Sequence, residues 1–446
     1  MYFTDFRYAE STHGADVQDI AGMRDIALTV VFFGILPYVF NRPYVGIYLW
    51  TWLGMMNPHR QTWGFAYDMP FALITALVTL FALLKYKGPK RIPWTRETIV
   101  LLIFNLWMLF TTFFALFPTE AWRQWDSKIW KIQLMIYVTL MLIDSRQKLN
   151  WLVWVIVFSL GFYGVKGGIF TITTGGAYHV QGPPNSFIGG NNEMGLALIM
   201  TIPLMRYLLL QARNFWLHKG LAIAMLLTGV AAIGTQSRGA LVGMLAMGTF
   251  LWLKSRNRLF TLLLILVVAG SVIAIMPQAW YDRMATIKTY EQDNSAMARI
   301  NSWWMAFNLA KDRLTGGGFE TFRERAFRLY APIPDVVPDA HSIYFEIMGE
   351  HGFIGLAIFL LLAWFTWNTG SRIKRMVKHD SESKWAADLA SMLQVSLVGY
   401  ASSGAFLGLA YFDLYYTLVA VMVICKLLVE EQLAVDKSPE MVHHAE

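Results

Sequence analysis

Three residues that could act on a phosphate-bearing substrate stand where long apolar blocks of this chain meet polar segments. Arg238 lies in "TQSRGALVG", Arg299 lies in "NSAMARINSWWMAF", and His341 follows "VPDA" at the start of a long apolar stretch. A guanidinium stays charged and binds phosphate oxygens through two parallel hydrogen bonds. A neutral imidazole accepts a proton near neutral pH. Together they predict arginine contacts to a phosphate and a histidine that acts as a general base.

Each of the three residues also has a purely structural interpretation. Arg238 would extend to lipid headgroups, Arg299 would lie on a solvated helix face, and His341 would form an interfacial hydrogen bond. An arginine at a membrane boundary is costly unless it meets a counter-charge. Gln236 and Ser237 precede Arg238 and indicate a polar pocket. The sequence therefore favours a functional Arg238 and leaves both interpretations of Arg299 and His341 open.

Four further polar residues are candidates for substrate contacts. Asp339, two residues before His341, either orients the imidazole or is an ordinary loop aspartate. Ser342 is a candidate N-cap of the apolar helix that follows. Asn191 and Asn192 in "GGNNEMG" precede another apolar block, and their amides suit either carbohydrate hydroxyls or helix capping.

The carboxylates near these residues are weaker candidates for a catalytic role. Glu346 and Glu350 lie farther along the apolar helix after His341, where an unpaired carboxylate is expensive. Glu350 precedes His351-Gly352 and marks a helix break, so it is the weaker catalytic candidate. Acidic and arginine residues alternate at helical spacing around "TFRERAFRLY", which predicts a salt-bridged surface helix. Its charged members are Glu320, Arg323, Glu324, Arg325 and Arg328.

The elements that must position these residues are membrane helices. The chain has 446 residues, of which 56% are hydrophobic and 15% are charged, against about 25% charged in soluble domains. Because only internally hydrogen-bonded backbone crosses lipid, the long apolar blocks predict an all-α polytopic membrane protein with about 12 transmembrane helices. The expected parts are a poorly ordered N-terminal extension over 1–22, a helix bundle over 23–276, a large helical periplasmic loop over 277–340, transmembrane helices over 341–432 and a cytoplasmic tail over 433–446.

Basic loops predict how the chain is oriented. Counting spans from residue 97 onward puts five basic loops on one side, and the positive-inside rule makes that side cytoplasmic. The opposite, non-cytoplasmic side then holds the loop 171–193, the turn 235–239, the segment 277–340 and His341. The basic residues are Lys85, Lys87, Lys90, Arg91 and Arg96; Arg146 and Lys148; Arg206, Arg213 and Lys219; Lys254, Arg256 and Arg258; and Arg372, Lys374, Arg375 and Lys378.

Several classes of protein and site are excluded by what the sequence contains. The net charge of +7 comes mainly from loops between spans, where topology explains it, so no nucleic-acid partner is expected. Cys425 is the only cysteine, which excludes an internal disulfide and a cysteine-based metal site. The sequence contains no P-loop, zincin pair or nucleophile elbow. We expect metal-independent chemistry without a cofactor.

The motifs together resemble the O-antigen ligase and polymerase superfamily over roughly residues 180–367. The resemblance is carried by "TQSRGALVG", by "ARINSWWMAFNLAKDRLTGGGFETF" and by "HSIYFEIMGEHGFIGL", in that order. The chain departs from the family pattern in Ser342, where Asn is common, and in the residue before the glycines, where proline is common. The segment "NRPYVGIYLWTWLGMMNPHRQTWGFAYDMPFA" is similar to a subgroup described as O-glycosylation ligases.

The resemblance implies an inverting, membrane-embedded glycosyltransferase of the GT-C type. Such an enzyme would transfer a glycan from undecaprenyl diphosphate to the lipid A–core oligosaccharide at the periplasmic face of the inner membrane, which completes lipopolysaccharide. Carried over residue by residue, Arg238 and Arg299 would hold the pyrophosphate and His341 would lie at the reacting centre.

Two alternatives use the same sequence features. The acceptor could be a protein serine or threonine, or the growing glycan itself, as in a polymerase. A lipid-linked glycan flippase would instead require charged residues within spans and two related halves. The notable polar residues gather at one membrane face and no halves match, which favours a transferase.

Overall fold

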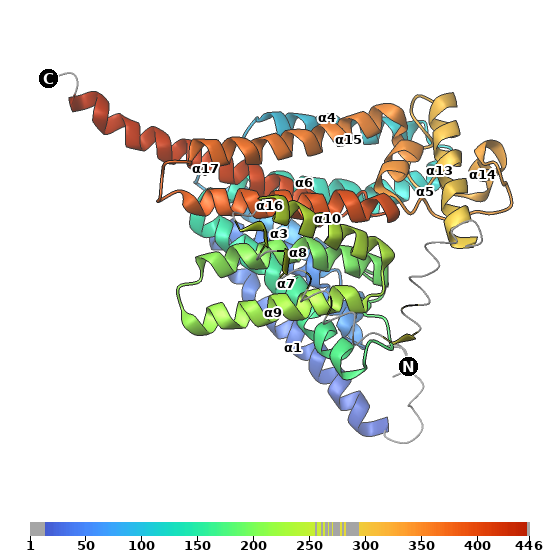
Figure 1. Ribbon diagram of the computed structural model, residues 1–446, viewed down its shortest axis with the longest axis horizontal. Coiled ribbons are helices and arrows are strands. Elements are labelled where there is room, and N and C mark those ends of the chain that lie inside the picture. The colour runs from blue at the N-terminus through green and yellow to red at the C-terminus, as the bar shows by residue number, and fades with distance from the viewer. Residues whose placement is uncertain are drawn as a thin grey trace. The chain divides into compact units, whose positions relative to one another are not determined.

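A computed structural model describes residues 14–443 of the chain except 255–256, 260–261, 264–265, 267–269, 271–276, 279–280 and 282–293. The described residues form helices and connecting segments, with no strand among them (Figure 1). The chain divides into two compact units. Unit 1 comprises Met1–Pro89 and Pro183–Ser186, and unit 2 comprises Lys90–Gly182 and Phe187–Glu446.

Unit 1 is built from three helices around a small apolar core. Pro43 removes a backbone donor and starts a new helix, so the first apolar region divides into two helices. Phe32, Leu53 and Phe71, one from each helix, are almost completely buried against one another. The elements are α1 (Gly14–Asn41), α2 (Pro43–Met56), η2 (Pro58–Gln61), η3 (Phe65–Asp68) and α3 (Phe71–Lys85).

Unit 2 contains the remaining helices and every predicted catalytic residue. Its elements are α4 (Arg96–Phe113), α5 (Pro118–Gln124), η4 (Trp125–Ile129), α6 (Trp130–Leu142), α7 (Arg146–Thr173), α8 (Asn191–Gln211), α9 (Phe215–Gly234), α10 (Arg238–Lys254), α13 (Asn294–Asp312), α14 (Glu324–Tyr330), α15 (Ile343–Met376), α16 (Lys384–Ser403), η6 (Gly404–Phe406) and α17 (Asp413–His443). Small residues let α7 and α9 approach closely, as is usual in membrane bundles. A Cβ atom added to Gly168 would lie 2.3 Å from the carbonyl oxygen of Leu227.

Six of the described helices are long and apolar enough to cross a membrane, judged by length and composition. They are Gly22–Asn41, Arg96–Phe113, Arg146–Thr173, Asn191–Gln211, Phe215–Gly234 and Ile343–Met376. The chain is therefore a helical membrane protein with several candidate spans. Residues 259–276, at the end of the helix bundle predicted over 23–276, lie largely outside the described residues.

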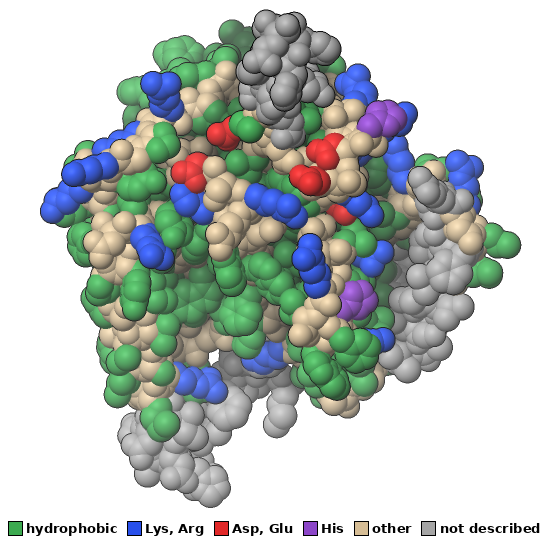
Figure 2. Space-filling view, turned by 90° about the vertical axis from the view of Figure 1, so that its left-hand side faces the viewer, with side chains coloured by type: hydrophobic (Ala, Val, Ile, Leu, Met, Phe, Trp, Pro, Cys, Tyr) green, Lys and Arg blue, Asp and Glu red, His purple; other side chains and the backbone are tan. Residues whose placement is uncertain are grey.

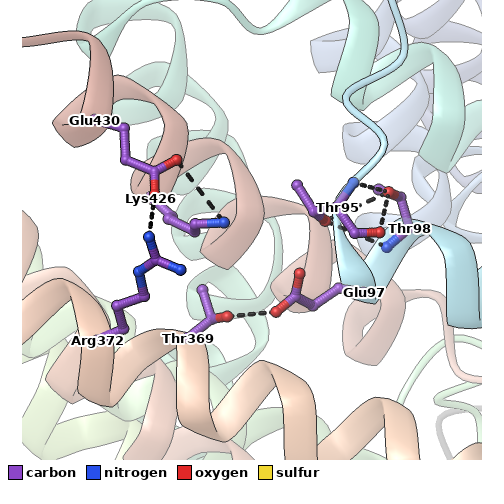
Figure 3. A network of polar contacts seen from close by, with 7 residues as sticks. All are labelled: Thr95, Glu97, Thr98, Thr369, Arg372, Lys426 and Glu430. Atoms are coloured by element: carbon purple, nitrogen blue, oxygen red, sulfur yellow. Dashed lines mark hydrogen bonds and ion pairs between the residues drawn. The ribbon is translucent and has the colours of Figure 1, made fainter. Parts of the chain in front are cut away.

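Polar contacts join α4, α15 and α17 near the C-terminal end of α15 (Figure 3). The buried Glu97 carboxylate accepts a hydrogen bond from the Thr369 hydroxyl. Arg372 lies 3.0 Å from Glu430, which also pairs with Lys426 at 3.8 Å. Figure 2 shows the left-hand side of Figure 1, where Lys and Arg side chains are spread among hydrophobic ones and acidic side chains are fewer.

The described part of the predicted large loop is helical and lies beside the first half of α15 (Figure 1). It contains α13 and α14, followed by an extended stretch that leads into α15. Arg323 pairs with Glu320 at 3.0 Å, and Arg328 pairs with Glu324, all with exposed side chains. The predicted salt-bridged surface helix is confirmed for Arg328, whereas Arg323 and Glu320 pair in the segment before α14 begins.

Candidate functional site

His341 stands immediately before α15 in an unusual backbone conformation. Its φ angle is 45°, in the left-handed region that non-glycine residues rarely adopt. Such conformations persist where the surrounding structure holds them, and they are common at functional sites. Ser342 occupies the N-cap position, as predicted, but its hydroxyl makes no capping hydrogen bond. The prediction of a side-chain cap is wrong, because the buried Ser342 Oγ has no hydrogen-bond partner among the described residues.

Side chains of α13 bind the extended stretch that ends at His341. The Asn301 amide donates to the carbonyl oxygens of Ile333 at 2.8 Å and Val336 at 2.9 Å. The Ser302 hydroxyl lies 3.0 Å from the Asp339 carbonyl oxygen. These bonds hold the extended stretch before His341 against α13.

Trp303 fixes the residue just before the histidine. Its indole N–H donates to the carbonyl oxygen of Ala340 at 3.0 Å. Its ring stacks on Phe345, in the first turn of α15, with centroids 4.9 Å apart and planes inclined by 6°. Trp303 therefore joins α13, the stretch before His341 and α15.

Arg299 lies one helical turn before Trp303 and acts electrostatically on His341. Burial, and then the positive charge of Arg299, lower the pKa of His341 below its ordinary value of 6.5, while Asp339 opposes the shift. The imidazole is therefore neutral near pH 7, the form that accepts a proton. Arg299, Asp339 and His341 are brought together as the sequence predicts.

The start of α8 reaches the same region. The charges of Glu193 and Asp339 interact through space, which places the first turn of α8 near the stretch before His341. Asn191 donates from its amide to the Thr235 carbonyl oxygen at 2.9 Å, so this side chain connects α8 to the turn before Arg238. Asn192 lies in the same first turn of α8 and is half-buried. Glu193 was not singled out from the sequence, although it follows both asparagines directly.

The turn over residues 235–239 is tightly held. Gln236 has a φ angle of 54° and donates from its amide to the Gly176 carbonyl oxygen at 2.9 Å. The Ser237 hydroxyl accepts from the backbone N–H of Ala240 at 3.2 Å and so caps α10. Gln236 and Ser237 thus serve the backbone around Arg238, which is the first residue of α10.

Contacts through η6 connect the Arg238 turn to Trp303. A Cβ atom added to Gly239 would lie 3.4 Å from the Ser403 carbonyl oxygen and 3.7 Å from Phe406. The Phe406 ring lies 6.5 Å from the Trp303 ring, centroid to centroid. Arg238 and His341 therefore lie at the same end of unit 2, because η6 contacts both the turn before α10 and Trp303 of α13.

Glu346 anchors another segment beside His341. Its carboxylate accepts from the backbone N–H of Ala410 at 2.9 Å. A Cβ atom added to Gly408 would lie 3.5 Å from that carboxylate and 3.6 Å from the His341 nitrogen. Glu346 therefore holds the segment before α17 against the histidine. Among the residues that the structure describes, no three His, Cys, Asp or Glu side chains are grouped to hold a metal ion.

Comparison with known families covers the part of the chain that contains these residues. Residues 223–360, which include the Arg238 turn, α13 and the start of α15, match the family described as O-Antigen ligase. The chain carries an O-antigen ligase domain. This match supports the assignment of the chain to the O-antigen ligase and polymerase superfamily, which the sequence motifs predict. Residues 23–213 match a family of unknown function, DUF5935. No curated protein matches the chain.

Proposed function

We propose that this O-antigen ligase-family protein transfers a glycan from undecaprenyl diphosphate to the lipid A–core oligosaccharide at the periplasmic face of the inner membrane. The observation that carries this proposal is the meeting of the Arg238 turn, α13 and His341 at one end of unit 2, within the matched domain. The fold would be of the GT-C type with about 12 spans, as the apolar blocks indicate.

The proposed chemistry divides between the two arginines and the histidine. Neutral His341 takes the proton of the acceptor hydroxyl, whose oxygen attacks the anomeric carbon of the donor sugar. The bond between that carbon and the diphosphate oxygen breaks, and configuration inverts because attack and departure occur on opposite faces. Arg238 and Arg299 stabilise the charge that develops on the departing diphosphate. This proposed transfer step uses neither a metal ion nor a nucleotide.

The electrostatics around His341 support its role as the base. Arg299 is positive and lowers the pKa of His341, so the free histidine is unprotonated at working pH. Once the proton has moved to the imidazole, Asp339 partly offsets the repulsion from Arg299. Asn191, Asn192, Gln236, Ser237, Asp339 and Ser342 are the proposed substrate contacts.

The proposal is tested by a transfer assay with purified protein in lipid nanodiscs. The donor is undecaprenyl-diphosphate-linked glycan, and separate reactions contain lipid A–core, a serine- and threonine-containing peptide, or no added acceptor. Product on lipid A–core supports the ligase. Product on the peptide, or a longer lipid-linked glycan without acceptor, would replace it with a protein glycosyltransferase or a polymerase. Absence of product in all three reactions would contradict the proposed function.

A further inference from the structure

The helix α15 breaks at Gly352, in the part of the helix that follows His341 and Ser342. Gly352 has φ 68° and ψ −175°, a combination that essentially only glycine adopts. At such a break, the carbonyl oxygens of the preceding turn lose the backbone N–H groups that would donate to them in a continuous helix. Those of Gly349 and Glu350 instead accept from Gly317 and Gly318, each at 2.8 Å.

The glycines of "LTGGGFETF" allow this backbone pairing. Gly316 and Gly318 have φ angles of 63° and 77°. A Cβ atom on Gly316 would lie 2.6 Å from the Gly352 nitrogen, and one on Gly352 would lie 2.2 Å from the Leu314 carbonyl oxygen. The glycine turn over 316–318 and the break in α15 therefore fit together backbone to backbone, with no room for side chains.

The Glu350 side chain holds this junction together. One carboxylate oxygen accepts from the Glu320 backbone N–H at 2.7 Å, and the other accepts from the Tyr411 hydroxyl. Glu320 has a left-handed φ of 60°, which aims its N–H at the carboxylate. Within the described part of the chain Glu350 forms no ion pair, so hydrogen bonds offset the cost of its burial.

His351 extends the junction to α4. Its Nε2 lies 2.8 Å from the Tyr411 oxygen, and its Nδ1 lies 2.7 Å from the Thr111 hydroxyl oxygen. The Trp107 indole donates to the His351 carbonyl oxygen at 2.9 Å. The Phe319 ring packs edge-on against His351 and Tyr411, at centroid distances of 4.6 and 5.1 Å. Four separate segments of unit 2 thus meet around Glu350.

We propose that Glu350 and Tyr411 are positioning residues for the transfer reaction. The attachments between α13 and the first part of α15 include Trp303, near Arg299, and the glycine turn, which follows the end of α13. Because Arg299 lies on α13 and His341 precedes α15, the Glu350 junction sets the separation of these two residues. This inference rests on the proposed function.

The kinetic test compares Glu350→Ala with Glu350→Gln. The alanine variant leaves the Glu320 N–H and the Tyr411 hydroxyl without their acceptor, and misplacement of about 1 Å lowers kcat about 100-fold. We expect the donor KM to change less than kcat, because Glu350 does not touch substrate. Glutamine restores most of the rate, since its oxygen accepts from Glu320 while its amide donates to the Tyr411 oxygen.

Two controls separate positioning from general damage. Glu324→Gln removes an exposed carboxylate that pairs with Arg328 and should keep the parental kcat. In a His341→Ala background, adding Glu350→Ala should lower kcat little further, because the effects of residues that act through one another are not additive. A full additional loss in that background, or parental kcat in Glu350→Ala, would overturn the positioning role.

A distance measurement tests the inference without enzymatic activity. Spin labels at Met297→Cys on α13 and Phe353→Cys beyond the break, positions 39% and 43% exposed, report the separation of the two helices in a Cys425→Ala background. We expect a narrow distribution in the parent, a broader or shifted one in Glu350→Ala and recovery in Glu350→Gln. Unchanged distributions would refute the junction even if the protein catalyses no transfer, whereas failed transfer with the expected distances would refute only the proposed function.

Discussion

The contact between Trp303 and the residue before His341 gives a prediction that separates anchoring from simple packing. In Trp303→Phe the ring remains to stack on Phe345, but the indole donor to the Ala340 carbonyl is lost. Ala340 is only 3% exposed, so its carbonyl loses a partner that water does not readily replace. Leaving a buried acceptor unpaired costs about 1–3 kcal/mol. Removing the ring in Trp303→Ala costs about 3–5 kcal/mol in total.

These free energies set the expected loss of rate. We assume that the free energy of the lost hydrogen bond is lost from the positioning of His341 in the transition state. Each loss of about 1.4 kcal/mol then lowers the rate tenfold. Trp303→Phe should therefore reduce single-turnover transfer by about 5- to 150-fold, and Trp303→Ala by more. The assay is transfer from the lipid-linked donor under donor saturation, with thermal unfolding recorded on the same samples.

The neighbouring tryptophan provides a matched control. Trp304 is 52% exposed and packs edge-on against Phe307, away from the stretch before His341. Trp304→Phe should keep the parental rate. If Trp303→Phe and Trp304→Phe both transfer at the parental rate, Trp303 does not anchor the histidine and the reasoning is refuted.

Three other predictions follow from the same geometry. Arg238→Lys and Arg299→Lys should each lower kcat/KM about 10- to 100-fold, because an ammonium does not replace a bidentate fork; parental kinetics in both would remove the diphosphate role. Since the pKa of His341 is lowered from 6.5 and the neutral form is active, kcat/KM should be constant near pH 7 and fall only at pH values below 6.5; an acid limb centred above 6.5 would contradict this. Gly352→Ala should lower the unfolding temperature, because its Cβ would lie 2.2 Å from a backbone oxygen, whereas Gly229→Ala, with no atom within 4 Å, should leave it unchanged or raise it; equal shifts would count against the tight fit.

Much of the site followed from local sequence patterns. The apolar blocks around "TQSRG" place Arg238 at the first residue of a helix, and the polar-to-apolar change at His341 marks the start of α15. The loop over 277–340 was predicted to be helical and contains α13, and alternating charge predicted the ion pairs of Arg323 and Arg328. These features depend on neighbours within one or two helical turns, which a sequence displays directly.

The contacts that hold the site together join residues far apart in the chain. Tyr411 and Glu350 are separated by 61 positions, and Thr111 and His351 by 240. Nothing in the local sequence around Tyr411 indicates a buried carboxylate as its partner. The pairing of the glycine turn with the break in α15 uses backbone groups, which carry no residue-specific signal. The Ser342 cap failed for a related reason, since tertiary packing buried its hydroxyl away from the helix N–H groups.

The most direct measurement is transfer by purified protein and by its His341→Ala variant, with undecaprenyl-diphosphate-linked glycan, lipid A–core and excess EDTA. The proposed mechanism predicts that the parent forms ligated product with inverted anomeric configuration in the presence of the chelator. It also predicts that His341→Ala, although folded, forms product at least about 100-fold more slowly, as expected when a general base is removed. Parental turnover by the variant, or retained configuration in the product, would contradict His341 as the base of a single inverting displacement.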